Sequence, residues 1–124
     1  MIRGSVNRKL EAVVRLSIRG PRKDVEAEAI LDTGFNGSLV LPPELIEELG
    51  LRRTTDGTAV LADGSKKLFD IYEALIFWDG RLLRILVGAV DNTPLLGMSL
   101  LQGSELAIQV VEGGEVFVRD LESW

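Results

Sequence analysis

The chain has 124 residues, of which 46% are hydrophobic and 27% charged, and its formal net charge at pH 7 is −5. It contains no Cys and no His, which excludes disulfides, thiolate metal sites, cysteine nucleophiles and catalytic triads that need histidine. Any catalysis must use carboxylates, Lys, Tyr or hydroxyl groups, and the acidic net charge argues against nucleic acid as the main ligand.

Length and patterning predict one domain. No apolar run approaches the roughly 20 residues that span a bilayer, and residues 1–5 lack the apolar stretch of a secretory signal, so we expect a soluble cytoplasmic protein. Residues 1–10 are polar and basic without periodicity and read as a basic N-terminal arm, which leaves residues 11–124 as the domain. Residues 1–24 hold seven basic and two acidic side chains. This excess predicts either a solvated strand face with a frayed arm, or an arm that docks on the acidic body of a partner subunit.

A β-hairpin is predicted to lead into an acidic triplet. Residues 12–18 and 25–31 alternate in the manner of strands with one buried face, and the Arg-Gly-Pro sequence at 19–21 separates them. The Asp-Thr-Gly triplet at 32–34 follows directly, which places the Asp32 carboxylate at a rigid strand end. The Gly of the triplet has no side chain to keep a substrate away. In a simpler interpretation the triplet is only a turn.

The remaining predicted elements follow in chain order: a buried strand over 38–41, a helix over 44–49, strands over 58–61, 66–77 and 82–90, a short helix that ends at 101, and strands over 106–111 and 116–118. Pro43 near the first turn and Gly50 just past the last turn mark the boundaries of the first helix. The Asp-Gly pair at 63–64 is typical of a tight hairpin turn.

Three motifs occur in a characteristic order. Residues 30–38 read Ile-Leu-Asp-Thr-Gly-Phe-Asn-Gly-Ser, and residues 93–101 contain two Leu and a Gly that open a short helix. Between them lies a hairpin whose tip is residues 62–65. This set resembles the retroviral-type (retropepsin-like, clan AA) aspartic proteases, whose active-site loop, flap hairpin and C-terminal helix motif have the same order. The resemblance covers about residues 10–120.

The resemblance implies a mainly β fold, a retropepsin-like closed β-barrel with a flap hairpin and one or two short helices. It also implies a homodimeric aspartic endopeptidase without a cofactor or metal, because the chemistry of this family needs two carboxylates and the chain has one Asp-Thr-Gly. A two-fold axis would place Asp32 beside its own copy. As is known for aspartic proteases, two such carboxylates share one proton. One acts as general base on a water and the other as general acid.

The resemblance further implies three groups of functional residues. The catalytic group is Asp32, Thr33 and Gly34, with Thr33 bonding across the dimer axis. The group that supports the loop is Ser38, Leu95, Leu96 and Gly97. The group that binds a peptide or protein substrate is Phe35 with the flap tip: Ala62, Asp63, Gly64 and Ser65. An apolar groove is expected near Phe35, Val60 and Leu61, and neither nucleic acid nor a membrane is expected as a partner.

Several positions depart from the family pattern. Phe35 stands where retroviral enzymes carry Ala and pepsin-type enzymes Ser, so it narrows the groove and cannot donate a hydroxyl hydrogen bond to Asp32. This loss predicts a less acidic optimum than that of pepsin-type enzymes. Asn36 and Gly37 replace an Asp pair, and Met98 replaces an Arg. These differences are more typical of prokaryotic members of the clan.

Two other functions stay open on the sequence: a non-catalytic dimerisation or peptide-binding module that keeps the fold, and a small β-barrel ligand-binding protein. The dimer interface is open as well. In retroviral enzymes the chain ends interleave in a shared sheet, and here either residues 116–124 or the basic arm is a candidate for that role.

Overall fold

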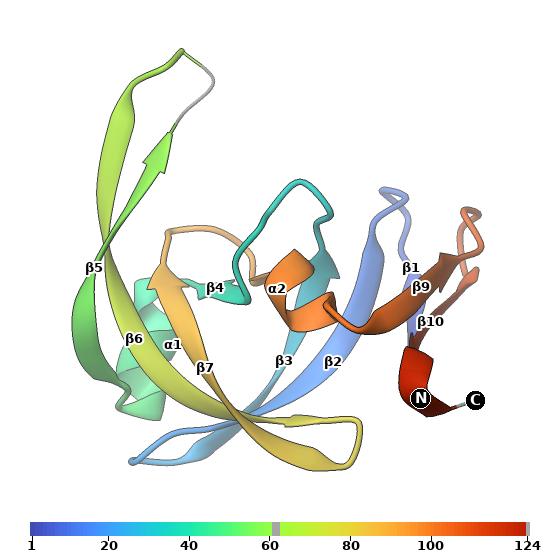
Figure 1. The fold of residues 1–124 in the computed structure, drawn as a ribbon, viewed down its shortest axis with the longest axis horizontal. Helices are drawn as coiled ribbons and strands as arrows, with labels where there is room; N and C mark the ends of the chain where they lie inside the picture. Colours follow the sequence, from blue (N-terminus) through green and yellow to red (C-terminus); the bar gives the residue numbers. More distant parts are fainter. Residues whose placement is uncertain (61–62, 124) are drawn as a thin grey trace.

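The computed structural model describes residues 1–60 and 63–123, and these form ten strands, two short α-helices and one 3₁₀ helix (Figure 1). The strands are β1 (Ile2–Val6), β2 (Ala12–Arg19), β3 (Asp24–Leu31), β4 (Leu39–Leu41), β5 (Arg52–Val60), β6 (Lys66–Trp78), β7 (Arg81–Ala89), β8 (Leu95–Leu96), β9 (Ser104–Ile108) and β10 (Glu115–Asp120). The helices are α1 (Pro43–Leu49), α2 (Met98–Leu101) and the 3₁₀ helix η1 (Leu121–Ser123). No helix in the described part of the chain is long and apolar enough to cross a membrane.

Six strands form a closed ring. Its pairings run from β6 through β7, β4, β8, β3 and β2, and β2 returns to β6 where residues 17–19 lie against residues 75–77. β5 extends the ring from β6 as the long hairpin that rises at the left of Figure 1. On the other side, β1, β10 and β9 extend it from β2. The predicted mainly β fold with a flap hairpin and short helices is confirmed.

Alternation in β2 shows how the sequence builds the core. Val14, Leu16 and Ile18 are only 1%, 2% and 0% exposed, while Arg15 between them is exposed, because successive strand residues point to opposite faces. β2 pairs with β3 in the predicted antiparallel hairpin, with Val13 opposite Ile30. Burial of each such aliphatic side chain stabilises the fold by roughly 1.5–3 kcal/mol.

Helix α1 begins and ends where its boundary residues predict. Pro43 occupies the first turn, where the missing N–H costs nothing. Gly50 ends the helix in the left-handed conformation with φ of 71°, and its N–H donates to the carbonyls of Ile46 and Glu47. Ile46 and Leu49 are buried against the ring. The helix thus packs against the ring next to β4.

The prediction of an N-terminal arm was wrong for residues 2–6, which form β1 between β2 and β10. Exposure alternates along this strand, but the strand is short and only its last residue, Val6, is buried, so the sequence pattern by itself is weak. Arg3 lies with its guanidinium 5.4 Å from the centroid of the Phe117 ring on β10. Sheet pairing with distant strands, rather than a local pattern, orders this segment.

Several basic side chains of the N-terminal region have acidic partners within the same chain. Arg15 lies 3.3 Å from Glu26, and Arg19 lies 3.6 Å from Asp24. All four side chains belong to the β2–β3 hairpin, so these pairs support the interpretation of the basic excess as a solvated strand face. Exposed pairs of this kind contribute about 0–1 kcal/mol each.

The C-terminal strands differ from the predicted ones in extent. The strand expected over 106–111 runs over 104–108, and residues 109–114 form the connection to β10. In that connection Val111 N donates to the carbonyl of Gln109 over 2.9 Å, a tight turn that ends the strand. β10 lies between β1 and β9 of its own chain, so the backbones of β1 and β10 are both paired internally.

Candidate active site

Asp32 follows the last residue of β3, at the point where three strand segments meet. Leu31 pairs in parallel with Leu96 of β8, and Leu39 of β4 pairs with Leu96 from the other side. The Asp32 N–H donates to the Leu96 carbonyl over 2.9 Å. Because all three Leu side chains are buried, the carboxylate projects from a rigid base while itself remaining partly accessible.

The loop after Asp32 turns back on the carboxylate. Gly34 N donates to Oδ1 of Asp32 over 2.9 Å, and Phe35 N donates to the Asp32 carbonyl over 3.1 Å. The first bond orients the carboxylate, since a carboxylate that accepts a backbone N–H loses rotational freedom. Thr33 and Gly34 are exposed at the tip of this loop, where a second molecule can reach them.

Gly97 and the start of α2 hold the far side of the loop. Gly97 N donates to the Ser38 carbonyl over 3.0 Å, and Met98 N donates to the Phe35 carbonyl over 2.8 Å. A Cβ added to Gly97 would lie 2.3 Å from the Gly37 carbonyl oxygen and 2.6 Å from that of Phe35. Only a residue without a side chain permits this approach. The structure therefore brings together the predicted supporting residues, Ser38, Leu95, Leu96 and Gly97.

Two glycines make room for the ring of Phe35. A Cβ on Gly37 would lie 2.5 Å from Cζ of Phe35, and a Cβ on Gly97 would lie 2.5 Å from its Cδ2. Two departures from the family pattern, the aromatic residue at 35 and the glycine at 37, are thus linked by packing. The ring occupies space that side chains at 37 and 97 would otherwise fill.

A groove of about 710 Å³ lies between the flap hairpin and the loop of residues 32–38 that carries Asp32, the predicted catalytic loop. Its apolar lining includes Phe35 from the loop, Val40 from β4, and Leu68 and Phe69 from β6. Acidic side chains at Asp56, Asp70 and Asp91 and the basic Lys67 complete its wall. Of the apolar residues expected to line a groove, Phe35 does so. Leu61 falls outside the described residues, as does the side chain of Val60.

The described part of the flap tip is a tight turn. Gly64 has φ of +84°, and Oδ1 of Asp63 accepts hydrogen bonds from Ser65 Oγ (2.6 Å) and Ser65 N (2.9 Å). These bonds, the hydroxyl's first, lower the pKa of Asp63 below its ordinary value of 3.8. Ala62 lies outside the described residues.

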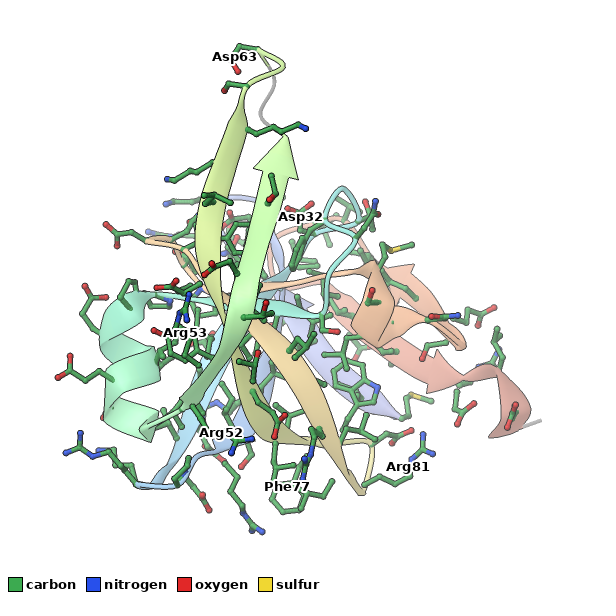
Figure 2. The ribbon with its side chains drawn as sticks, turned by 60° about the vertical axis from the view of Figure 1, so that its left-hand side comes forward. Asp32, Arg52, Arg53, Asp63, Phe77 and Arg81 are labelled. Atoms are coloured by element: carbon green, nitrogen blue, oxygen red, sulfur yellow. The ribbon has the colours of Figure 1, made fainter. Side chains whose placement is uncertain are left out.

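The flap hairpin stands away from the catalytic loop. Figure 2 shows Asp63 at the far end of the hairpin and Asp32 well below it, and in Figure 1 the hairpin rises at the side of the loop. The structure does not bring the predicted substrate-binding residues 63–65 onto Asp32.

A charge cluster stiffens the base of the flap. Asp56 on β5 and Asp70 on β6 lie directly opposite each other, an arrangement that destabilises a hairpin when both are ionised. Arg53 hydrogen-bonds to Asp70 over 3.1 Å and contacts Asp56. The hydrogen bond to Asp70 and the charges of both carboxylates raise the pKa of Arg53. The single cation offsets one of the two negative charges and so reduces the repulsion within the opposed pair.

Ser99 is a supporting residue that the sequence interpretation missed. Its hydroxyl donates to the Asn36 carbonyl over 2.5 Å, and its N–H donates to the Gly37 carbonyl over 3.1 Å. These bonds brace the loop at the place where retroviral enzymes use charged residues. A Ser in the first turn of a predicted helix was the available signal.

Within residues 1–60 and 63–123, no group of three or more Asp or Glu side chains is placed to hold a metal ion.

The closed ring, the flap hairpin and the strand-end Asp-Thr-Gly loop define a retropepsin-like fold, the fold of retroviral aspartic proteases. A solved structure, EIAV protease complexed with the inhibitor HBY-793, is similar with a TM-score of 0.58 and 25% sequence identity. The match covers 74% of this chain and 86% of that one. No protein-family profile matches the sequence. No curated protein matches it either.

Proposed function

We propose that this chain is one subunit of a homodimeric aspartic endopeptidase in which Asp32 of each subunit supplies one catalytic carboxylate. The observation that carries the proposal is the setting of Asp32. Its carboxylate stands at the end of a buried strand, accepts a hydrogen bond from Gly34 N, and belongs to a loop held from behind by Gly97. The likeness to EIAV protease supports the same chemistry.

The mechanism follows from placing two acidic side chains together. Two carboxylates about 3 Å apart cannot both ionise cheaply, so the pair holds one proton. The ionised Asp32 takes a proton from a water between the two groups, and that water attacks the scissile carbonyl carbon. The protonated Asp32 of the other subunit hydrogen-bonds the carbonyl oxygen and donates its proton to it. The tetrahedral intermediate then collapses without an acyl-enzyme. The Asp32 that took the proton of the water gives it to the leaving nitrogen, the other Asp32 takes a proton from a hydroxyl of the intermediate, and the C–N bond breaks.

The groove beside Phe35 suits a peptide in an extended conformation. Its apolar wall favours an apolar side chain of the substrate, and the edge of the flap hairpin offers backbone groups to an extended chain. In this proposal Thr33 bonds to its copy across the axis, and the flap residues 63–65 close over the bound peptide. Closure excludes water other than the reacting one.

One observation favours a second candidate, a peptide-binding module without turnover. Phe35 lines the groove next to the catalytic loop, and a ring of this size at the wall can obstruct the approach of a scissile bond to Asp32. Both candidates need the dimer and the groove, and they differ only in whether a peptide bond is broken.

The decisive experiment compares two isosteric substitutions, one directly after β3 and one at its start. A mixed peptide library is incubated with the protein, with Asp32→Asn and with the control Asp24→Asn at the exposed start of β3. Cleavage that is lost only in Asp32→Asn, and that a statine-type peptide inhibits, supports the endopeptidase. Binding of the same peptides without cleavage supports the second candidate. Cleavage that survives Asp32→Asn refutes the assignment of Asp32.

A further inference from the structure

The two ends of the sheet are protected very differently. β5 and β9 are the terminal strands in the pairing order. The β5 edge carries charged side chains, Arg52, Arg53 and Asp56, and its register shifts between residues 53 and 55. Charge and a bulge are the usual means of preventing a further strand from pairing. The β9 sequence, Ser-Glu-Leu-Ala-Ile, has no Pro, Lys or Arg.

The hydrogen-bond pattern shows which groups of β9 face outward. Gln109 N donates to the Glu115 carbonyl over 2.9 Å, in register with the β9–β10 pairs. Hydrogen-bonded and non-hydrogen-bonded pairs alternate along an antiparallel ladder, so residues 105 and 107 bond to β10. The N–H and C=O groups of Ser104, Leu106 and Ile108 therefore point to the open side.

Apolar side chains are exposed at both ends of this edge. Leu121, whose N–H donates to the Gly103 carbonyl at the start of β9, is 46% exposed. At the other end Ile108, Val110 and Val111 are 37%, 63% and 61% exposed. The one charged residue of β9, Glu105, is paired with Arg119 of β10 over 2.6 Å. The one charge on β9 is thus paired within the chain, and exposed apolar side chains flank the edge at both ends.

The same edge is joined closely to the catalytic loop. Gly97, which packs under the loop, is followed by α2, and Gly103 with φ of +84° turns the chain from α2 into β9. Neither β1 nor β10 offers an alternative free edge, because both are paired on both sides within the chain. A second copy that binds at β9 therefore binds next to the element that supports Asp32.

We propose that β9 is the dimer interface, pairing antiparallel with β9 of a second copy about a two-fold axis through Leu106. This inference rests on the proposed function, whose site is incomplete without the second Asp32. In this register each of the three outward residues bonds a residue of the copy through both its N–H and its C=O. Glu105 faces Ala107 of the second copy, so no like charges are opposed. The result is one continuous sheet through both subunits.

The absence of cysteine allows a direct test of this register. Glu105→Cys and Ala107→Cys proteins are mixed and oxidised. In the proposed pairing these two positions are directly opposite at a Cα separation of about 4.5 Å, within reach of a disulfide. In a dimer of either variant alone, the two cysteines are diagonal neighbours across the interface, with their Cα atoms about 7–8 Å apart. Thr58→Cys on the other edge strand is the matched control. We expect a covalent dimer in the mixture, little in either variant alone, and none for Thr58→Cys.

A second variant tests the interface without a cross-link. Ile108→Pro removes an outward N–H but none that bonds to β10, so the chain keeps its own ladder. By symmetry the dimer loses two hydrogen bonds, one from each copy. At the usual strength of such bonds, this loss predicts a dimer dissociation constant roughly 30-fold higher, which sedimentation measures. Leu86→Ser, which removes an exposed apolar side chain on β7, is the control and leaves dimerisation unchanged.

The outcomes separate this inference from the proposed function. A dimer that cleaves peptides but gives no cross-link in the mixture, or that cross-links equally through Thr58→Cys, overturns the β9 interface alone. A mixture that cross-links as expected in a protein that cleaves no peptide supports the interface and overturns the endopeptidase. A strict monomer at concentrations where peptides are cleaved overturns both.

Discussion

Replacement of Gly97 by Ala tests whether close backbone contact under the catalytic loop is required. Gly97 itself has an extended backbone, with φ of −111° and ψ of −177°, so Ala fits its conformation and only space is at issue. The added methyl group would lie 2.3 Å from the Gly37 carbonyl oxygen, whereas ordinary contact begins at 3.4 Å. The loop must therefore move by about 1 Å.

That movement has a cost in both stability and activity. It breaks or lengthens the bonds from Met98 N to the Phe35 carbonyl and from Ser99 N to the Gly37 carbonyl. Two such bonds at about 1 kcal/mol each, with about 1–3 kcal/mol of overpacking, predict a loss of about 3–5 kcal/mol in the free energy of unfolding. If the proposed function holds, a displacement of this size lowers kcat/KM by about 100-fold.

Urea denaturation measures the first effect, and peptide hydrolysis measures the second. Gly80→Ala is the matched control, because a Cβ there meets open space but φ is +81°. Its turn joins β6 to β7 at the bottom of Figure 1, away from the catalytic loop. We expect it to cost about 1–2 kcal/mol with unchanged kcat/KM. A Gly97→Ala protein with the stability of the parent and full hydrogen-exchange protection of the 98 and 99 amides would refute the reasoning.

Three further predictions concern other parts of the molecule. Gly37→Ala forces its methyl group onto the Phe35 ring, so it should destabilise the parent by about 1–3 kcal/mol but much less when Phe35→Ala is also present; additive effects in denaturation would contradict this contact. The pKa of Asp63 is lowered in the folded protein, so its hydrogen bonds with Ser65 stabilise the turn fully above pH 3.8, and this contribution is lost as the pH falls through the lower folded pKa. Ser65→Ala should therefore raise the pKa of Asp63 in an NMR titration. An unchanged pKa would count against the two hydrogen bonds. Leu16→Ala, at a fully buried position, should lower the free energy of unfolding by about 2–5 kcal/mol in urea denaturation, and a loss below 1 kcal/mol would mean that β2 does not build the core.

Local patterns in the sequence determined a large part of this fold. The alternation in residues 12–18 and 25–31 predicted the β2–β3 hairpin, and Pro43 and Gly50 predicted the limits of α1. The hairpin and the helix limits follow from interactions between near neighbours, namely the period of side-chain burial and the φ preferences of Pro and Gly, which the sequence records directly. The retropepsin-like architecture was predicted in another way, from the resemblance of the Asp-Thr-Gly loop, the flap hairpin and the C-terminal helix motif to that family.

Only the tertiary structure decided which distant segments meet. Residues 2–6 become a strand because β2 and β10 each offer a free edge, and β10 rather than a partner's chain fills the place beside β1. Gly37 and Gly97 are sixty residues apart in the sequence. Together they make space for the ring of Phe35. Such contacts depend on which backbone edges and which volumes remain after the ring has closed. No local periodicity encodes that choice, because pairing between distant strands is settled by the whole sheet at once.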